Sequence, residues 1–263
     1  MRILRMSSFS ILALMACITA SSAADEGTII KGQVILDKVP KVEEVVVTAD
    51  KAVCCKDGPL ASTQMLVDPK SKGVKNVIVW LRPNDKIRGN EFPKDKIPEA
   101  LRKPKAVTHI IDQPKCQFEP RVLAARAGDK LIVKNSASIA HNVNFASPID
   151  GQSFNKLLQV NAELAVENAF TANRFPIAIS CNIHPWMAAR IRVFDHPFYA
   201  TTDANGKFEI KGVPEGTWNI VYWHEGGFHM GIDGIYGFAT EVKGKTLELK
   251  PVTLDFAKKE DKK

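Results

Sequence analysis

The sequence predicts an all-β protein built from two β-sandwiches. Short runs in which apolar and polar residues alternate recur along the chain, as expected of strands with one buried face. Gly, Pro, Asn and Asp separate these runs, and the only helical pattern, in residues 94–104, is interrupted by Pro98. About 240 residues remain after the N-terminal segment described next, which is enough for one large or two modest domains.

The first residues have the composition of a secretory signal peptide. Arg2 and Arg5 precede an apolar run, and small residues suited to cleavage follow near Ala24, so residues 1–24 form the predicted signal. In the alternative, the sequence "LMAC" makes Cys17 the lipidated first residue of a lipoprotein. No later apolar run reaches the roughly 18 residues that a transmembrane helix needs. We therefore expect a periplasmic or secreted protein without a transmembrane segment.

The charge of the chain gives little information about partners. Removal of the signal peptide lowers the formal net charge from +7 to +5. Residues 257–263 form a tail of mixed charge, and no basic run is interleaved with aromatic residues as in a nucleic-acid surface. We expect no nucleic acid among the ligands.

The strand-like runs fall into three segments, 25–104, 105–196 and 197–256. The first contains "KGQVIL", "VEEVVVTA" and "NVIVWL", and the last contains "KFEI", "WNIVYW" and "LELKPVTLDF". Residues 201–225, "TTDANGKFEIKGVPEGTWNIVYWHE", resemble the carboxypeptidase-regulatory or transthyretin-like domains, which are Ig-like sandwiches. In such domains the first strands contain Gly-x-Val, and here these lie far upstream. The resemblance implies a discontinuous sandwich, into which residues 105–196 are inserted.

The sequence "CNIHPWM", residues 181–187, places three soft ligands at a spacing of three. Pro185 is incompatible with a helix, so the stretch is predicted as a loop between the strand "FPIAIS" and a strand after residue 189. Such a loop would hold Cys181, His184 and Met187 around one point. The alternative is that Cys181 and Met187 are ordinary core residues.

A mononuclear site made from this loop needs one more strong ligand, and His141 is the best candidate. In "HNVNF", period-two alternation places His141 on the same face as Val143 and Phe145, toward the core. Two imidazoles, one thiolate and one thioether are the set that selects copper for electron transfer. Zinc is a poor match for Met, and a binuclear copper centre would need a second Cys in the loop.

Residues 107–195 resemble the cupredoxins, the Greek-key blue copper proteins of the amicyanin and plastocyanin type. The resemblance rests on "HNVNF", on Cys-x-x-His-x-x-Met with Pro and Trp after the His, and on the hairpin-like "RVLAARAGDKLIVKN". It implies one type I copper ion bound by His141, Cys181, His184 and Met187, with Asn142 tying the two ligand loops together. It also implies that the ring edge of His184 is exposed and passes the electrons.

The expected function is one-electron transfer without catalysis. The expected partner is a redox protein such as a cytochrome or a periplasmic oxidoreductase. In the alternative, the protein is a copper carrier, or a module that binds carbohydrate or a surface through its transthyretin-like sandwich.

The remaining cysteines and histidines give two further expectations. In an oxidising compartment, Cys116 should form a disulfide with Cys54 or with Cys55, of which Cys54 is favoured. A vicinal disulfide between Cys54 and Cys55 and a second copper site are the alternatives. The sequence "HEGGFHM" lacks the spacing of a zinc protease, and its His224, Glu225 and His229 are candidates for a second metal or substrate site.

Overall fold

The structure, a computed structural model, describes residues 27–87, 92–103, 105–166 and 170–256. Within these residues the chain forms seventeen strands, two α-helices and two 3₁₀ helices of three or four residues each. The prediction of an all-β protein with more than one sandwich is confirmed. The predicted signal peptide with its alternative at Cys17, and the charged tail, lie outside the described residues. No helix in the described part of the chain is long and apolar enough to cross a membrane.

One domain, called here the outer domain, consists of two sheets. The first sheet has the order β12-β1-β16 with β17 also paired to β1, and the second has the order β11-β2-β13-β14 with β15 paired to β13. The strands are β1 (Thr28–Ile35), β2 (Ile78–Pro83), β11 (Tyr199–Thr201), β12 (Lys207–Val213), β13 (Gly216–His224), β14 (Gly227–Phe228), β15 (Phe238–Val242), β16 (Thr246–Glu248) and β17 (Val252–Thr253). The 3₁₀ helix η2 (Asp233–Tyr236) follows β14.

Strands that are far apart in the sequence pair within this domain. β1 is antiparallel to β12, with Ile30 opposite Ile210, and β2 lies between β11 and β13. The side chains between the two sheets form one apolar core in which Ile30, Leu81 and Ile220 are buried. Both ends of the described chain therefore contribute to a single sandwich.

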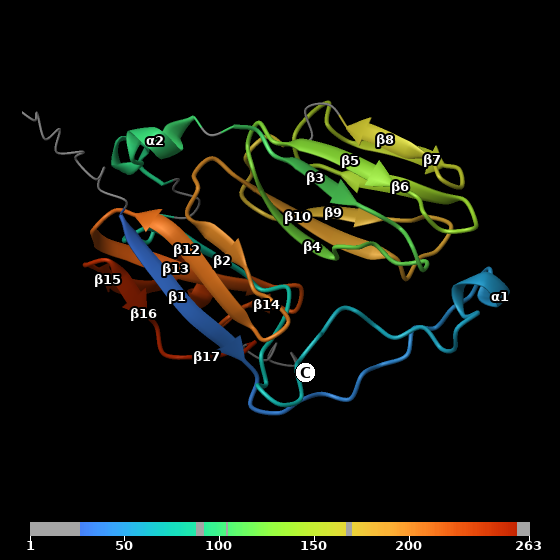
Figure 1. The fold of residues 1–263 in the computed structure, drawn as a ribbon, viewed down its shortest axis with the longest axis horizontal. Helices are drawn as coiled ribbons and strands as arrows, with labels where there is room; N and C mark the ends of the chain where they lie inside the picture. Colours follow the sequence, from blue (N-terminus) through green and yellow to red (C-terminus); the bar gives the residue numbers. More distant parts are fainter. Residues whose placement is uncertain (1–26, 88–91, 104, 167–169, 257–263) are drawn as a thin grey trace, which may run out of the picture.

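The strands between β2 and β11 form a second domain, called here the inserted domain. Its sheets have the orders β4-β10-β9-β6-β7 and β3-β5-β8. The strands are β3 (Thr108–Ile111), β4 (Val122–Arg126), β5 (Lys130–Lys134), β6 (His141–Ala146), β7 (Phe154–Leu158), β8 (Glu163–Val166), β9 (Ile177–Ser180) and β10 (Ala188–Phe194). Figure 1 shows this domain, in green and yellow, beside the outer domain.

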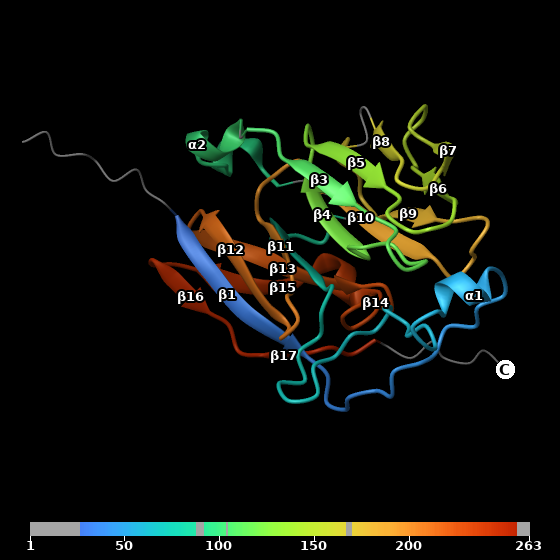
Figure 2. The ribbon, with the colours of Figure 1, turned by 45° about the vertical axis from the view of Figure 1, so that its right-hand side comes forward.

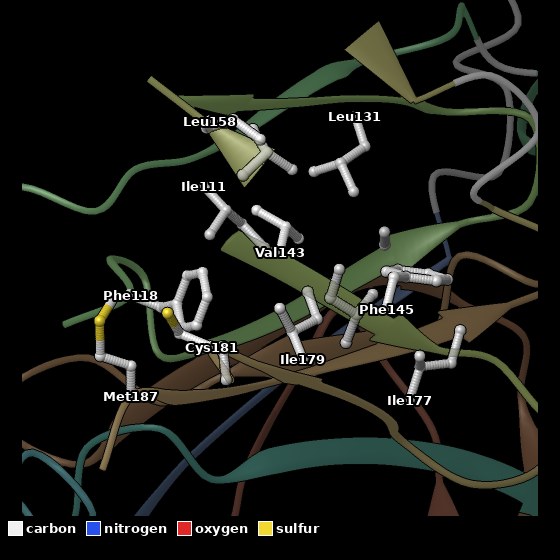
Figure 3. Close-up of a cluster of buried hydrophobic side chains, with 14 of the residues drawn as sticks. Ile111, Phe118, Leu131, Val143, Phe145, Leu158, Ile177, Ile179, Cys181 and Met187 are labelled. Atoms are coloured by element: carbon white, nitrogen blue, oxygen red, sulfur yellow. The ribbon is translucent and has the colours of Figure 1, made fainter. Parts of the chain in front are cut away.

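The core of the inserted domain lies between its two sheets. Leu131 from one sheet and Val143, Phe145 and Ile179 from the other are fully or almost fully buried in it (Figure 3). Alternate residues of each strand supply these side chains, as the alternating pattern predicts. The predicted metal ligands lie at one end of this core.

A smaller apolar cluster and an ion pair join the two domains. Trp80 and Trp223 of the outer domain pack with Val122 and Phe194 of the inserted domain. Next to them, Glu225 pairs with Arg121. The domains are thus packed together rather than linked only by the chain.

Two segments before the inserted domain test the predictions of local structure. The alternating run 42–49 was expected to be a strand, and this is wrong: only Glu44 makes an isolated bridge, to Ala61, and Val46 is 80% exposed. Val45, Val47 and Ala49 are half-buried and Val46 and Thr48 exposed, so the faces alternate as in a strand, but no sheet lies beside the run to complete one. Residues 94–102 form the 3₁₀ helix η1 (Lys94–Lys96) and the helix α2 (Glu99–Arg102), separated at Pro98 as predicted.

Candidate metal centre

Three strands position the predicted ligands. His141 is the first residue of β6, Cys181 directly follows β9, and Met187 directly precedes β10. β9 and β10 are antiparallel neighbours, and the loop between them is closed by hydrogen bonds from the Met187 nitrogen to the His184 oxygen (2.9 Å) and from the Cys181 nitrogen to the Met187 oxygen (3.3 Å). This tight loop returns His184 toward His141.

His141, Cys181 and His184 converge, and all three are buried. Their ligand atoms lie within 4.8 Å of one another, and no other group of three or more His, Cys, Asp or Glu side chains meets this condition among the described residues. The Nδ1 atoms of the two histidines are 2.8 Å apart, and the Cys181 sulfur is 3.7 Å from His184 Nδ1. The structure therefore brings together three of the four predicted ligands.

Met187 belongs to the same end of the core. Its side chain is fully buried in the cluster that contains Cys181 and Phe118. Figure 3 shows the sulfur-bearing side chains of Met187 and Cys181 next to Phe118 at this end of the cluster. The thioether is thus held beside the thiol, away from water.

Asn142 connects the two ligand-bearing segments. Its side-chain oxygen accepts hydrogen bonds from the Asn182 backbone nitrogen (2.7 Å) and from the Cys181 thiol (3.2 Å). Its side-chain nitrogen donates to the Asn155 side-chain oxygen at 2.7 Å. Asn142 therefore occupies the position at which the resemblance implied a link between the ligand loops.

The electrostatics of the centre favour the neutral imidazole of His141. Burial lowers the pKa of His141 to about 4; the neighbouring His184 acts in the same direction and Asp50 opposes it. His184 Nε2 lies 2.9 Å from an oxygen of the Asp50 carboxylate. An ionised carboxylate only accepts hydrogen bonds, so Nε2 is the donor in this contact, and Nδ1 is the ring nitrogen that faces His141. Neutral imidazole is the form that binds a metal.

The donors fit one small metal ion. Two nitrogens bound at 2.0–2.1 Å to one tetrahedral ion lie roughly 3.3 Å apart. The two Nδ1 atoms at 2.8 Å would need to separate by only about 0.5 Å, and the sulfur-to-nitrogen distance of 3.7 Å already suits a shared ion. His141 Nε2 is buried without a hydrogen-bond partner among the described residues, and the other ring nitrogen, Nδ1, contacts His184 at the centre.

One expectation about the loop is wrong. The ring edge of His184 was expected at the surface, but the residue is 0% exposed. The ring packs against His141 and Trp186, and the carboxylate of Asp50, 134 positions earlier in the chain, contacts Nε2. Nothing in the sequence around Asp50 signalled this contact, because it depends on where a long irregular segment folds back.

Cys54 and Cys116 form a disulfide, with their Cα atoms 5.5 Å apart. Cys54 ends the helix α1 (Lys51–Cys54), and Cys116 lies between β3 and β4. Cys55 is unpaired and half-buried. This arrangement leaves no room for the vicinal disulfide or for a second copper site that uses Cys54 and Cys116.

His224, Glu225 and His229 are not brought together as a site. His224 Nδ1 accepts a hydrogen bond from the Gly226 nitrogen at 3.1 Å, and His229 Nδ1 accepts one from the Asp255 nitrogen at 3.2 Å. Glu225 instead pairs with arginines of the inserted domain. Each of the three side chains thus has a separate set of partners in the structure.

Comparison with known proteins yields partial likenesses. No family model and no curated protein matches the chain. Among solved structures, one likeness is to a copper-containing nitrite reductase from Thermus scotoductus SA-01, at 20% identity and a TM-score of 0.29. The match covers 35% of this chain and only 23% of the reductase chain. An oxidised mutant of amicyanin matches 34% of this chain and 81% of its own, at 20% identity and a TM-score of 0.29.

A third likeness is to a purple cupredoxin from Nitrosopumilus maritimus. It matches 34% of this chain and 99% of its own, at 19% identity and a TM-score of 0.27. At such identities and TM-scores, none of these matches establishes a family or a function for this chain.

Proposed function

We propose that the protein is an exported copper protein that carries single electrons and catalyses no reaction itself. One observation carries the proposal: His141, Cys181 and His184 converge in a buried site, with the thioether of Met187 in the same core. Thiolate and thioether favour Cu(I), and imidazoles accommodate Cu(II), so this set tolerates both oxidation states. A bound copper ion would supply reversible one-electron chemistry.

The chain would keep the ligands nearly fixed during electron transfer. Two of the ligands directly adjoin β9 and β10, and His141 begins β6, which pairs with β9. Asn142 fixes the loop relative to β6 through the Asn182 nitrogen. Rigid ligands lower the cost of reorganisation when the charge of the centre changes, which favours transfer of an electron over binding of a substrate.

The proposed location and partner follow from the same features. The disulfide between Cys54 and Cys116 supports an oxidising compartment, such as the periplasm or the extracellular space. The proposed partner is a redox protein such as a cytochrome or a periplasmic oxidoreductase. Four protein ligands would leave no open position for a substrate, which supports transfer rather than catalysis.

A second candidate function is a copper carrier. Its supporting observation is that both His141 and His184 are fully buried, so no ligand edge is presented to a redox partner. In this case the protein would hold Cu(I) and release it to an acceptor, rather than exchange electrons.

A reductive titration of the copper-loaded protein distinguishes the two candidates. The electron carrier is expected to take up one electron per chain reversibly, to return it to a soluble one-electron oxidant, and to retain copper throughout. Met187→Leu, which keeps the volume of the buried side chain, is expected to shift the reduction potential without loss of binding. Loss of copper upon each cycle, or no reversible couple, would contradict electron transfer and favour the carrier.

A further inference from the structure

A segment between β1 and β2 crosses from the outer domain to the metal centre. We call residues 43–63 the arm. Its two legs bond to each other, from the Val45 nitrogen to the Leu60 oxygen (2.7 Å) and from the Ser62 nitrogen to the Glu43 oxygen (2.8 Å). Figures 1 and 2 both show α1, at the tip of the arm, away from β1 and beside the inserted domain.

Further contacts besides that of Asp50 fix the arm to the inserted domain. Val47 packs against the core of that domain, and Cys54 is covalently bonded to Cys116. The Gln117 side-chain nitrogen donates to the Ala61 oxygen at 2.7 Å. The tip of the arm is therefore anchored on both sides of Asp50.

The side chain of Asp50 contacts His184 instead of capping the helix that follows it. Its backbone is left-handed, with φ at 49°, and its carbonyl accepts hydrogen bonds from the Val53 and Cys54 nitrogens, both at 2.9 Å. Asp at the first position of a helix commonly caps the helix with its side chain. Here the carboxylate makes no such bond in α1 and contacts His184 Nε2 instead.

The Asp50 carboxylate lies between His184 and solvent. The Asp50 side chain is 48% exposed, whereas that of His184 is 0% exposed. Ile183, the residue before His184 in the loop, is exposed, so the chain reaches the surface directly beside the covered imidazole. Since Nε2 is the donor to this carboxylate, Nδ1 is the ring nitrogen turned toward His141 and the Cys181 sulfur.

We infer that Asp50 is a positioning residue for the metal centre: it fixes the ring and the tautomer of His184, and its charge tunes the bound metal. This inference rests on the proposed function. A carboxylate that accepts the second N–H of a ligand histidine orients the ring and raises its basicity. The negative charge stabilises the more highly charged oxidised state and so lowers the reduction potential. Electrons would then not pass directly from the edge of His184 to a partner.

The first test uses the full-length mature protein with and without Cu(I), which is diamagnetic and permits NMR of the ligand histidines. In the wild type, the His184 Nε2–H is expected to be present and slow to exchange with solvent. Asp50→Ala should accelerate its exchange at least about tenfold and raise the dissociation constant for Cu(I) by about 10- to 100-fold. The matched control is Asp57→Asn, which removes one exposed carboxylate from the same arm and should change neither quantity.

The second test isolates the charge. Asp50→Asn keeps an acceptor and tolerates the left-handed backbone, so it should retain the protected Nε2–H but raise the reduction potential above that of the wild type and of Asp57→Asn. This variant also serves if Asp50→Ala does not fold. Equal potentials, or wild-type exchange and affinity in Asp50→Ala, would overturn the inference. A wild type that binds no copper would refute the proposed function, and exchange of the Nε2–H without metal would still decide the role of Asp50.

Discussion

The side-chain oxygen of Asn142 accepts a hydrogen bond from the backbone nitrogen of Asn182 at 2.7 Å, which joins β6 to the loop between β9 and β10. One neutral side chain thereby holds the segment that carries His141 against the segment that carries Cys181 and His184. Backbone groups of a tight loop are difficult to satisfy by other means, so the loss of this one acceptor affects both segments.

Asn142→Ala should destabilise the protein by about 2 kcal/mol, because the buried bonds to Asn182 and Cys181 lose their acceptor. Chemical denaturation measures this change. Asn144→Ala, two residues further along the same strand at a half-buried position, is the control and should cost less than about 1 kcal/mol. Equal losses in the two variants would contradict the linking role of Asn142.

The Cys54–Cys116 disulfide closes a loop of 62 residues and should contribute about 4 kcal/mol by restricting the unfolded chain. The double variant Cys54→Ser, Cys116→Ser should lose stability of this order, whereas Cys55→Ser should change it little. Labelling of the unfolded, unreduced mature protein should count two thiols, those of Cys55 and Cys181. A count of four thiols would show that Cys54 and Cys116 are not bonded to each other.

His196 should make stability depend on pH. Burial lowers its pKa to about 3 from 6.5, and Arg192 and Arg126 act in the same direction. Between these values the unfolded state binds a proton that the folded state does not, so stability falls as pH falls below 6.5, with a slope of about 1.4 kcal/mol per pH unit.

The matched variant for this prediction is His196→Asn. Asn does not titrate, and it offers an acceptor for the Phe198 nitrogen, which now donates to His196 Nδ1 at 3.1 Å. Urea denaturation from pH 6 to pH 4 measures the free energy of unfolding. It should fall less steeply in the variant, by the slope of about 1.4 kcal/mol per pH unit that one bound proton contributes. Identical slopes would show that His196 is protonated in the folded protein.

Glu225 should stabilise the junction of the domains. Its side chain is 3% exposed, pairs with Arg121 and lies 3.6 Å from Arg190. Removal of one partner of a buried ion pair leaves an uncompensated charge, so Glu225→Ala should cost about 3 kcal/mol in denaturation. Glu241→Ala breaks the exposed pair with Lys243 and should cost less than about 1 kcal/mol. A Glu225→Ala variant as stable as that control would refute the role.

Local pattern predicted much of the fold. The alternation in "HNVNF" predicted that His141, Val143 and Phe145 are buried, as they are, because a strand alternates its faces whatever its neighbours are. For residues 42–49 the same argument predicted a strand, and this was wrong: alternate residues are half-buried, but the run makes only one isolated bridge, between Glu44 and Ala61. Alternation shows which residues of a strand would face the core. Whether a neighbouring strand is present to pair with it depends on the rest of the chain.

The loop 181–187 predicted the convergence of its ligands, because Pro185 excludes a helix and two antiparallel strands must be joined there. The burial of His184 was not predictable in this way. It depends on the arm, and Asp50 reaches His184 across 134 positions of sequence. Spacing rules act over a few residues, so they cannot place a segment that returns from another domain.

The visible spectrum of the Cu(II)-loaded protein tests the central claim most directly. A thiolate bound to Cu(II) by a short bond gives an intense charge-transfer band, so one equivalent of copper should produce a strong visible absorption in the wild type. Cys181→Ser, a nearly isosteric change, should abolish the band, while Cys55→Ser, which alters the other unpaired cysteine of the described residues, should leave it intact. A wild-type protein that binds one equivalent of Cu(II) without this band, or a band that survives in Cys181→Ser, would contradict the account.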